Sequence, residues 1–321
     1  MSIISVRDLK KTYNKGKTQA LKGISFNVEQ GEIFGLIGPD GAGKTSIFRI
    51  LSTLILADSG RAEVDGYDVV KDYKAIRQHI GYMPGRFSLY QDMTVEENLS
   101  FFATVFNTTI EENYHLIEDI YKQIEAFKTR RAGKLSGGMK QKLALSCALI
   151  HAPHVLFLDE PTTGVDPVSR KEFWEMLQKL KKNFNLSIVV STPYMDEAVQ
   201  CDRIALIQNG SFLTIDTPHN IIGCYDETLW SIESNRMHKL LTDLRTINGI
   251  KTAFAFGETH HITIDETLLT RDSLKAKLFK LGHSEIRIEK VAPSIEDCFM
   301  NLLRYDASGP IHFPTGSVQR M

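Results

Sequence analysis

The sequence predicts an α/β fold organised around a parallel β-sheet. Three short apolar segments, residues 31–38, 154–160 and 186–191, have the length and continuity of central strands buried on both faces. Segments with helical spacing of apolar residues lie between them, notably residues 45–54 and 168–182. Strands that alternate with helices form a parallel sheet whose two faces the helices cover.

Composition sets broad limits on what the chain does. Its 321 residues are too many for one compact core and suit two domains. The net charge of −1, with no basic block, predicts no nucleic-acid partner. No apolar run approaches the roughly 18 residues of a membrane span, and the segment MSIISVRDLKK lacks the apolar core of a signal peptide. The cysteines fit no CxxC spacing and are expected to be the reduced thiols of a cytosolic protein: Cys147, Cys201, Cys224 and Cys298.

The remaining elements of the first domain, residues 1–222, follow from local pattern. Residues 94–150 are expected to be mostly helical, with one apolar face made of Ile117, Ile120, Tyr121, Ile124 and Phe127. Asn209-Gly210 suits the tight turn of a hairpin. Further strands are expected at residues 2–8, 19–28 and 58–66 and in the hairpin 203–215.

The pattern changes after about residue 225 and predicts a second domain, residues 225–305. Strand-like and helix-like segments follow one another in the order βαββαβ: residues 229–233, 235–245, 251–256, 261–265, 272–281 and 285–290. This order predicts a small α+β ferredoxin-like domain, which a helix at 294–304 closes. The tail, residues 306–321, is expected to be disordered. His260 and His261 fall in the expected hairpin and are interpreted as solvated turn residues, not metal ligands.

Residues 38–45 read GPDGAGKT, the Gly-x-x-x-x-Gly-Lys-Thr pattern of a phosphate-binding loop. Its glycines allow backbone N–H groups to point inward at a polyphosphate, and the helix that follows adds the positive end of its dipole. Lys44 supplies a charge for the terminal phosphates, and the Thr45 hydroxyl is a ligand for Mg²⁺. A chance match is the alternative, but the loop lies between an apolar strand and a helix, as the motif requires. The expected ATP-binding residues are Gly38, Pro39, Asp40, Gly41, Ala42, Gly43, Lys44, Thr45 and Ser46.

The apolar segment VLFLDE, residues 155–160, ends in two acids. Asp159 at the end of a buried strand is suited to hold Mg²⁺ together with Thr45. Glu160 is the expected catalytic residue, which accepts a proton from the attacking water. Two acids that simply start a loop are the alternative, and the phosphate-loop pattern upstream favours the site.

The segment LSGGMKQ, residues 135–141, resembles the signature of ABC ATPases. The resemblance implies a P-loop NTPase fold of ABC type, in which an antiparallel β subdomain and a helical subdomain, here about 86–150, flank the parallel core. It also implies that Ser136, Gly137, Gly138 and Gln141 contact the γ-phosphate of ATP held by a second subunit, arranged head to tail. An ordinary Ser-capped helix is the alternative.

Two further residues agree with the resemblance, which covers about residues 1–220. Tyr13 lies where the family has an aromatic residue that stacks on adenine. Asp166 lies in the loop through which, in the family, the two subunits communicate. Their alternatives are a strand-end tyrosine and a turn aspartate before Pro167. Residues 225–305 resemble the additional C-terminal domain of exporter-type ABC subunits.

Two positions depart from the family pattern. The family has a glutamine after the strand that reads IGYMP here, and this chain has Gly85. The family also has a histidine after the strand that ends at Thr192, and this chain has Pro193, which offers neither a side-chain donor nor an N–H. Both changes affect the site built by this chain's own loop, whereas the signature is intact.

The sequence therefore predicts an ATP-hydrolysing subunit that powers an ABC exporter through a separate membrane permease, from the cytoplasmic face of the membrane. The two departures predict a weakened site and pairing with a second, non-identical ATPase. The alternative is a clamp or regulatory ABC subunit with little hydrolysis of its own. A further alternative is a non-transport ABC ATPase that acts on translation or DNA, but such proteins usually have two ATPase domains in one chain or a long coiled-coil insertion, and this sequence shows one such domain and no such insertion.

Overall fold

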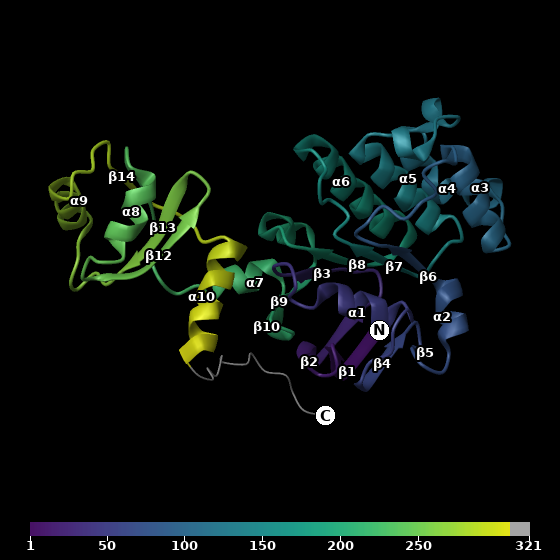
Figure 1. The fold of residues 1–321 in the computed structure, drawn as a ribbon, viewed down its shortest axis with the longest axis horizontal. Helices are drawn as coiled ribbons and strands as arrows, with labels where there is room; N and C mark the ends of the chain where they lie inside the picture. The colour runs from purple at the N-terminus through teal and green to yellow at the C-terminus, as the bar shows by residue number, and fades with distance from the viewer. Residues whose placement is uncertain (309–321) are drawn as a thin grey trace. The chain divides into compact units, whose positions relative to one another are not determined.

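The computed structural model describes residues 1–308 of the chain. They belong to two compact units, Met1–Pro218 and a second unit that begins at His219 (Figure 1). No helix of residues 1–308 is both long and apolar enough to cross a membrane.

A six-stranded sheet forms the centre of the first unit, in the order β10-β9-β3-β8-β7-β6. Neighbouring strands from β9 to β6 run parallel, and β10 returns antiparallel to β9. Asn209 and Gly210 make that turn with φ of 49° and 78°, as the sequence predicted. The strand bounds are β3 Ile33–Ile37, β6 Ile80–Met83, β7 Val155–Asp159, β8 Ser187–Thr192, β9 Arg203–Gln208 and β10 Ser211–Asp216. The parallel core predicted from the apolar segments is confirmed.

An antiparallel sheet, in the order β2-β1-β4-β5, lies on one side of the parallel sheet, and α1 packs between the two sheets (Figure 1). Apolar side chains from both sheets and from α1 form one buried cluster, which includes Phe34, Phe48 and Phe157. β1 and β2 are longer than predicted because Lys10 and Lys11 continue the ladder to Lys22 and Leu21 while keeping their ammonium groups outside the core. The bounds are β1 Ser2–Tyr13, β2 Thr18–Glu29, α1 Lys44–Leu51, β4 Ser59–Val64 and β5 Tyr67–Asp68.

Helices cover the opposite face of the parallel sheet (Figure 1). Two of them begin with a capping box. The hydroxyl oxygens of Thr94 and Thr109 accept from the backbone N–H groups of Glu97 and Glu112, and the backbone N–H groups of the two threonines donate to the carboxylates of those glutamates. The predicted apolar face of 94–150 is largely buried, at Ile117, Ile120, Tyr121 and Ile124. The α-helices on this face are α3 Val95–Val105, α4 Ile110–Tyr121, α5 Gly137–Leu149 and α6 Pro167–Phe184, with short 3₁₀ turns at Glu125–Phe127 and Ala132–Lys134 and a further one at Met195–Gln200. The helix α2 Tyr73–His79 lies instead on the side of α1 and the antiparallel sheet (Figure 1), where its Ile76 joins the buried cluster.

The second unit contains a four-stranded antiparallel sheet in the order β12-β13-β11-β14. With the helices Met237–Leu244 and Arg271–Lys280, which lie between its strands in sequence, it has the β–α–β–β–α–β order of ferredoxin-like folds. The bounds are α7 Pro218–Gly223, β11 Leu229–Glu233, α8 Met237–Leu244, β12 Ile250–Phe256, β13 Thr259–Ile264, α9 Arg271–Lys280, β14 Arg287–Lys290 and α10 Ile295–Ser308. The helix α10 continues to Ser308, so residues 306–308 of the predicted disordered tail are helical instead, and the rest of that tail, residues 309–321, lies outside the described residues.

The interpretation of His260 and His261 as solvated turn residues is wrong. Both belong to β13, and the hairpin turn precedes them at Gly257. His260 is buried, and its Nε2 lies 2.9 Å from the carbonyl oxygen of Met237. His261 pairs through Nδ1 with the buried Asp297, 2.7 Å away, and its ring stacks on Phe256. Tertiary packing against the neighbouring helices supplies partners that the local sequence does not reveal.

The stability of the first unit is expected to depend on the aromatic pair between α1 and β7. Phe48 and Phe157 are fully buried and meet edge to face, with ring centroids 5.7 Å apart. Phe157→Ala is expected to lower the free energy of unfolding by about 3–5 kcal/mol, because it removes buried area and leaves a cavity. Urea unfolding followed by Trp174 fluorescence, in a Trp230→Phe background, reports on this unit alone. Val168→Ala, at a side chain 70% exposed, is the control and is expected to change stability little.

Candidate functional site

The loop between β3 and α1 wraps around the ammonium group of Lys44. Lys44 Nζ donates to the carbonyl oxygens of Gly38 at 2.6 Å and Pro39 at 3.1 Å, and the residue is only 3% exposed. Gly43 caps α1 with φ of 114°, and a Cβ there would lie 2.6 Å from the Ala20 carbonyl oxygen, so only glycine fits. The result is a tight loop at the N-terminus of a helix, a geometry suited to anions.

Two carboxylates reach this loop from the end of β7. Thr45 Oγ1 lies 3.3 Å from Asp159 Oδ1, and Lys44 Nζ lies 3.3 Å from Glu160 Oε1. A hydroxyl and a carboxylate oxygen side by side are the oxygen ligands that Mg²⁺ prefers. The structure thus brings together Lys44, Thr45, Asp159 and Glu160, which the sequence assigned to one site.

Ser191, near the end of β8, is a member of this cluster that sequence reasoning missed. Its hydroxyl donates to Asp159 Oδ1 at 2.6 Å and accepts from the Glu160 backbone N–H at 3.0 Å. Glu160 has φ of 52°, which is uncommon for a residue other than glycine, and these contacts hold it there. A small polar residue at the end of the apolar run LSIVVS was the available signal.

Tyr13, at the end of β1, reaches the same loop from the antiparallel sheet. Its hydroxyl lies 3.2 Å from Ser46 Oγ in α1, and the Lys11 ammonium is 5.6 Å from the centre of its ring. The ring therefore flanks the start of α1, beside the loop.

The signature residues and Asp166 form a second group. Ser136 caps α5 by accepting from the Met139 N–H at 3.3 Å, and Asp166 caps α6 by accepting from the Ser169 N–H at 3.0 Å. The Ser169 hydrogen bond lowers the pKa of Asp166, so this carboxylate is charged at neutral pH. A Cβ on Gly138 would lie 2.8 Å from Ser169 Oγ, so the starts of the two helices are in close contact. Within residues 1–308, no hydrogen bond or ion pair joins this group, Gln141 included, to the loop around Lys44.

The two departures both border the first group. A Cβ on Gly85 would lie 3.1 Å from the Asp159 carbonyl oxygen and 3.8 Å from Glu160 Cβ. Pro193 follows Thr192, whose carbonyl oxygen accepts from the Gly38 N–H at 3.3 Å. Positions 85 and 193 therefore lie beside the two acids and the start of the loop, respectively.

A cavity of about 490 Å³ lies beyond position 85, between the helices and the sheet. Its lining is mostly apolar and includes Met83, Phe87, Phe102, Phe106 and Gln141. Within the helical segment, Val105 is 53% exposed beside this cavity. The cavity is thus an apolar recess whose lining includes Pro84 and Phe87, on either side of Gly85 and Arg86.

The chain matches the sequence profile of the ABC transporter family over residues 21–163. It is 36% identical over 311 residues to the "Nod factor export ATP-binding protein I" of Burkholderia lata, covering 93% of this chain and 96% of that one. It is 30% identical over 332 residues to the "Doxorubicin resistance ATP-binding protein DrrA" of Mycobacterium tuberculosis, covering 98% of both chains. The "Probable multidrug ABC transporter ATP-binding protein YbhF" of Escherichia coli is 35% identical over 323 residues, and the chain spans 54% of its length.

Solved structures give the same assignment. The chain is similar to cbiO1 of Clostridium perfringens, part of the ABC transporter complex cbiONQ, with 27% identity and a TM-score of 0.62 over 70% of this chain and 91% of that one. The dimeric cassette MJ0796, in a post-hydrolysis state bound to ADP and Pi, gives a TM-score of 0.60 at 25% identity, over 67% of this chain and 98% of that one. The fold is that of the ABC ATPase cassettes. The chain belongs to the family of ABC transporter ATP-binding proteins.

Proposed function

We propose that the chain binds ATP with Mg²⁺ in the loop of residues 38–46. The observation that carries this proposal is the Lys44 ammonium, which is buried and whose partners within residues 1–308 are two loop carbonyls and the Glu160 carboxylate. The triphosphate would offer it stronger, charge-assisted partners. Thr45 and Asp159 would hold Mg²⁺, which neutralises charge on the phosphates. Tyr13 would stack on the adenine, beside α1.

Glu160 is the general base in this proposal. Its carboxylate lies at the loop, and its backbone is fixed by Ser191, so it is positioned to orient and deprotonate a water. Ser136, Gly137, Gly138, Gln141 and Asp166 would serve the ATP of a second subunit, because they lie apart from the chain's own loop at the start of α5 and α6. This arrangement requires a head-to-tail dimer.

Lys44→Ala is expected to weaken ATP binding by roughly 10- to 100-fold, since it removes charge-assisted hydrogen bonds worth about 1.5–3 kcal/mol. Titration of a fluorescent ATP analogue measures the affinity. Lys182→Ala, at an exposed lysine on α6, is the matched control and should bind as the wild type does. If Lys44→Ala bound nucleotide with unchanged affinity while folded by circular dichroism, the loop would not be the site.

The chain is further proposed to power export through a separate membrane permease, at the cytoplasmic face. Relatives named for drug resistance and for Nod factor export support the exporter assignment. The cavity beyond Gly85 supports docking by the permease, because its apolar lining would bury a short membrane-protein helix. Exposed Arg86 and Gln91 in the same segment offer polar contacts. The transported compound is chosen by the permease.

Residues 86–130 are expected to carry the docking surface. A photo-crosslinker placed at Arg86 or Val105 should link to the co-expressed permease, and links should fall when Phe102→Arg places a charge in the apolar recess. The same crosslinker at Phe279, a 71% exposed side chain of the second unit, is the comparison. Links from Phe279 alone would place the docking surface elsewhere.

The chain's own site is proposed to hydrolyse ATP slowly. Glutamine and histidine are absent at positions 85 and 193, both of which border the acids or the loop. Loss of one transition-state donor costs about 10²–10³ in rate, so loss of both leaves a site suited to holding ATP. A second, non-identical ATPase that keeps both residues would then supply most turnover, using this chain's signature.

Two variants in the mixed dimer separate the sites. Glu160→Gln is expected to reduce turnover modestly, because it affects only the slow site. Ser136→Arg is expected to abolish most turnover, because a large, charged side chain would enter the site that this chain's signature forms with the second ATPase. Loss of a general base at a working site costs about 10²–10⁴-fold, so steady-state phosphate release distinguishes the outcomes.

The reverse pattern would contradict the asymmetric arrangement. If Glu160→Gln stopped hydrolysis and Ser136→Arg were mild, the site bordered by Gly85 and Pro193 would be the working one. A chain that hydrolysed at neither site in any dimer, yet still bound ATP, would favour the second candidate: an ATP-dependent clamp or regulatory subunit. The observation that favours this candidate is that positions 85 and 193 hold glycine and proline instead of glutamine and histidine.

A further inference from the structure

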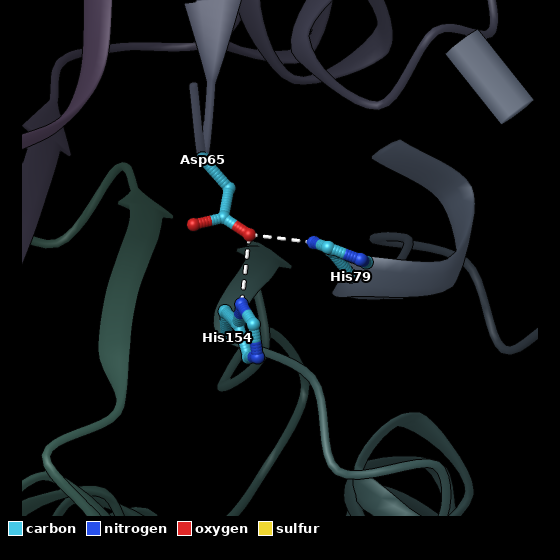
Figure 2. Close-up of side chains that lie close together, drawn as sticks. All are labelled: Asp65, His79 and His154. Atoms are coloured by element: carbon cyan, nitrogen blue, oxygen red, sulfur yellow. Dashed lines mark hydrogen bonds and ion pairs between the residues drawn. The ribbon is translucent and has the colours of Figure 1, made fainter. Parts of the chain in front are cut away.

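Three side chains able to ligate a metal converge at the amino ends of β6 and β7 (Figure 2). Asp65 belongs to the turn between β4 and β5, His79 is the last residue of α2, and His154 directly precedes β7. Asp65 Oδ2 lies 2.6 Å from His79 Nδ1 and 2.7 Å from His154 Nδ1. The three ligand atoms all lie within 4.8 Å of one another. Segments far apart in the sequence thus direct one carboxylate and two imidazoles at one point.

The backbone fixes this convergence without any ion. The parallel register pairs Ile80 with Val155, and the His154 N–H donates to the His79 carbonyl oxygen at 2.8 Å. The two histidines are therefore neighbours across the ladder, with ring centroids 4.9 Å apart. The Asp65 N–H donates to the Ile3 carbonyl oxygen at 2.8 Å, which ties the turn to β1. Because folding has already ordered all three ligands, a metal ion would bind without an ordering cost.

The chemistry of the donors selects a class of ion. Two imidazole nitrogens and one carboxylate oxygen suit Zn²⁺ and neighbouring first-row ions, whereas Mg²⁺ and Ca²⁺ prefer oxygen ligands. His154 has a side chain 59% exposed, and a cavity of about 390 Å³ borders it and Asp65, which leaves an entry path and room for a water ligand.

We propose that Asp65, His79 and His154 form a binding site for a divalent transition metal ion, with Zn²⁺ as its representative. The ion would displace the protons now shared with Asp65, and each imidazole would carry its proton on Nε2 instead. With metal–ligand bonds of about 2.0–2.2 Å, a tetrahedral site separates its ligand atoms by roughly 3.3 Å. The two Asp65 contacts, now 2.6 and 2.7 Å, must lengthen by about 0.6–0.7 Å, which side-chain rotation allows.

The site is separate from the ATP site. His154 precedes the first residue of β7, and Asp159 is its last, so about 17 Å of strand separates them at roughly 3.3 Å per residue. A bound ion would join the β4–β5 turn of the antiparallel sheet to the start of the parallel sheet. It is therefore expected to stabilise the fold of the first unit without replacing any contact of Lys44.

The test uses the full chain after treatment with EDTA, in the absence of nucleotide and Mg²⁺. The protein carries Cys224→Ser, because Cys224 is the exposed thiol among the four cysteines and could itself bind Zn²⁺. Isothermal titration with Zn²⁺ alone should give one ion per chain. Asp65→Asn keeps a residue that tolerates the positive φ of 52° at this turn but loses the charge, and His154→Ala removes the most exposed ligand. Each should weaken binding at least tenfold, since loss of even an outer-shell partner costs about 10–100-fold. His238→Ala, at an exposed histidine outside the cluster, should bind as the parent does.

A second measurement distinguishes loss of the metal site from misfolding of a variant. Zn²⁺ should raise the melting temperature of the parent and of His238→Ala, and not that of Asp65→Asn or His154→Ala. Co²⁺ in place of Zn²⁺ should give visible absorption that the two cluster variants lose. The proposal is overturned if no Zn²⁺ binds, or if both cluster variants, folded by circular dichroism, bind it as tightly as the parent. The triad would then be a hydrogen-bonded cluster only.

Discussion

Strands β3, β8 and β7 end side by side at the same edge of the parallel sheet, and the geometry of the candidate site depends on that pairing. The Gly38 N–H, just past β3, donates to the Thr192 carbonyl oxygen at the end of β8. The Glu160 N–H, just past β7, donates to the Ser191 carbonyl oxygen. The Ser191 hydroxyl then sets the position of Asp159. A shift of one residue in the pairing of β7 with β8 would turn the Asp159 or the Ser191 side chain to the other face of the sheet and separate the two.

Much of this arrangement could be predicted from the sequence because its signals are local. The run GPDGAGKT needs glycine at fixed spacing, and continuous apolar runs such as VLFLD mark buried strands. Ser191 could not be assigned a role, because its partners Asp159 and Glu160 lie about 30 residues away and only the strand pairing brings them close. The same holds for Asp65, His79 and His154, which no spacing along the chain connects. The environment of His260 and His261 could not be predicted either, because their partners on α8 and α10 lie 23 and 36 residues away.

The contacts in the first unit also explain how the two departures could affect rate without preventing binding. Gly85 and Pro193 border Asp159, Glu160 and the start of the loop, but neither takes part in holding Lys44. Phosphate contacts would come from the loop, Lys44 and the helix dipole, all of which are retained. Under the proposed function, the missing groups are donors that would act on the attacking water and on charge that develops during reaction. The proposed function therefore separates ATP binding from ATP turnover at this site.

The most direct measurement is steady-state ATP hydrolysis by the purified chain alone, beside a variant that restores both residues, Gly85→Gln with Pro193→His. A Cβ at position 85 would lie 3.1 Å from the Asp159 carbonyl oxygen, so the restored glutamine requires only a small shift. Both proteins should bind ATP, the wild type should hydrolyse it slowly, and the double variant should hydrolyse it at least tenfold faster, since one transition-state donor is worth about 10²–10³ in rate. Rapid hydrolysis by the wild type that the double substitution leaves unchanged or lowers would contradict the account.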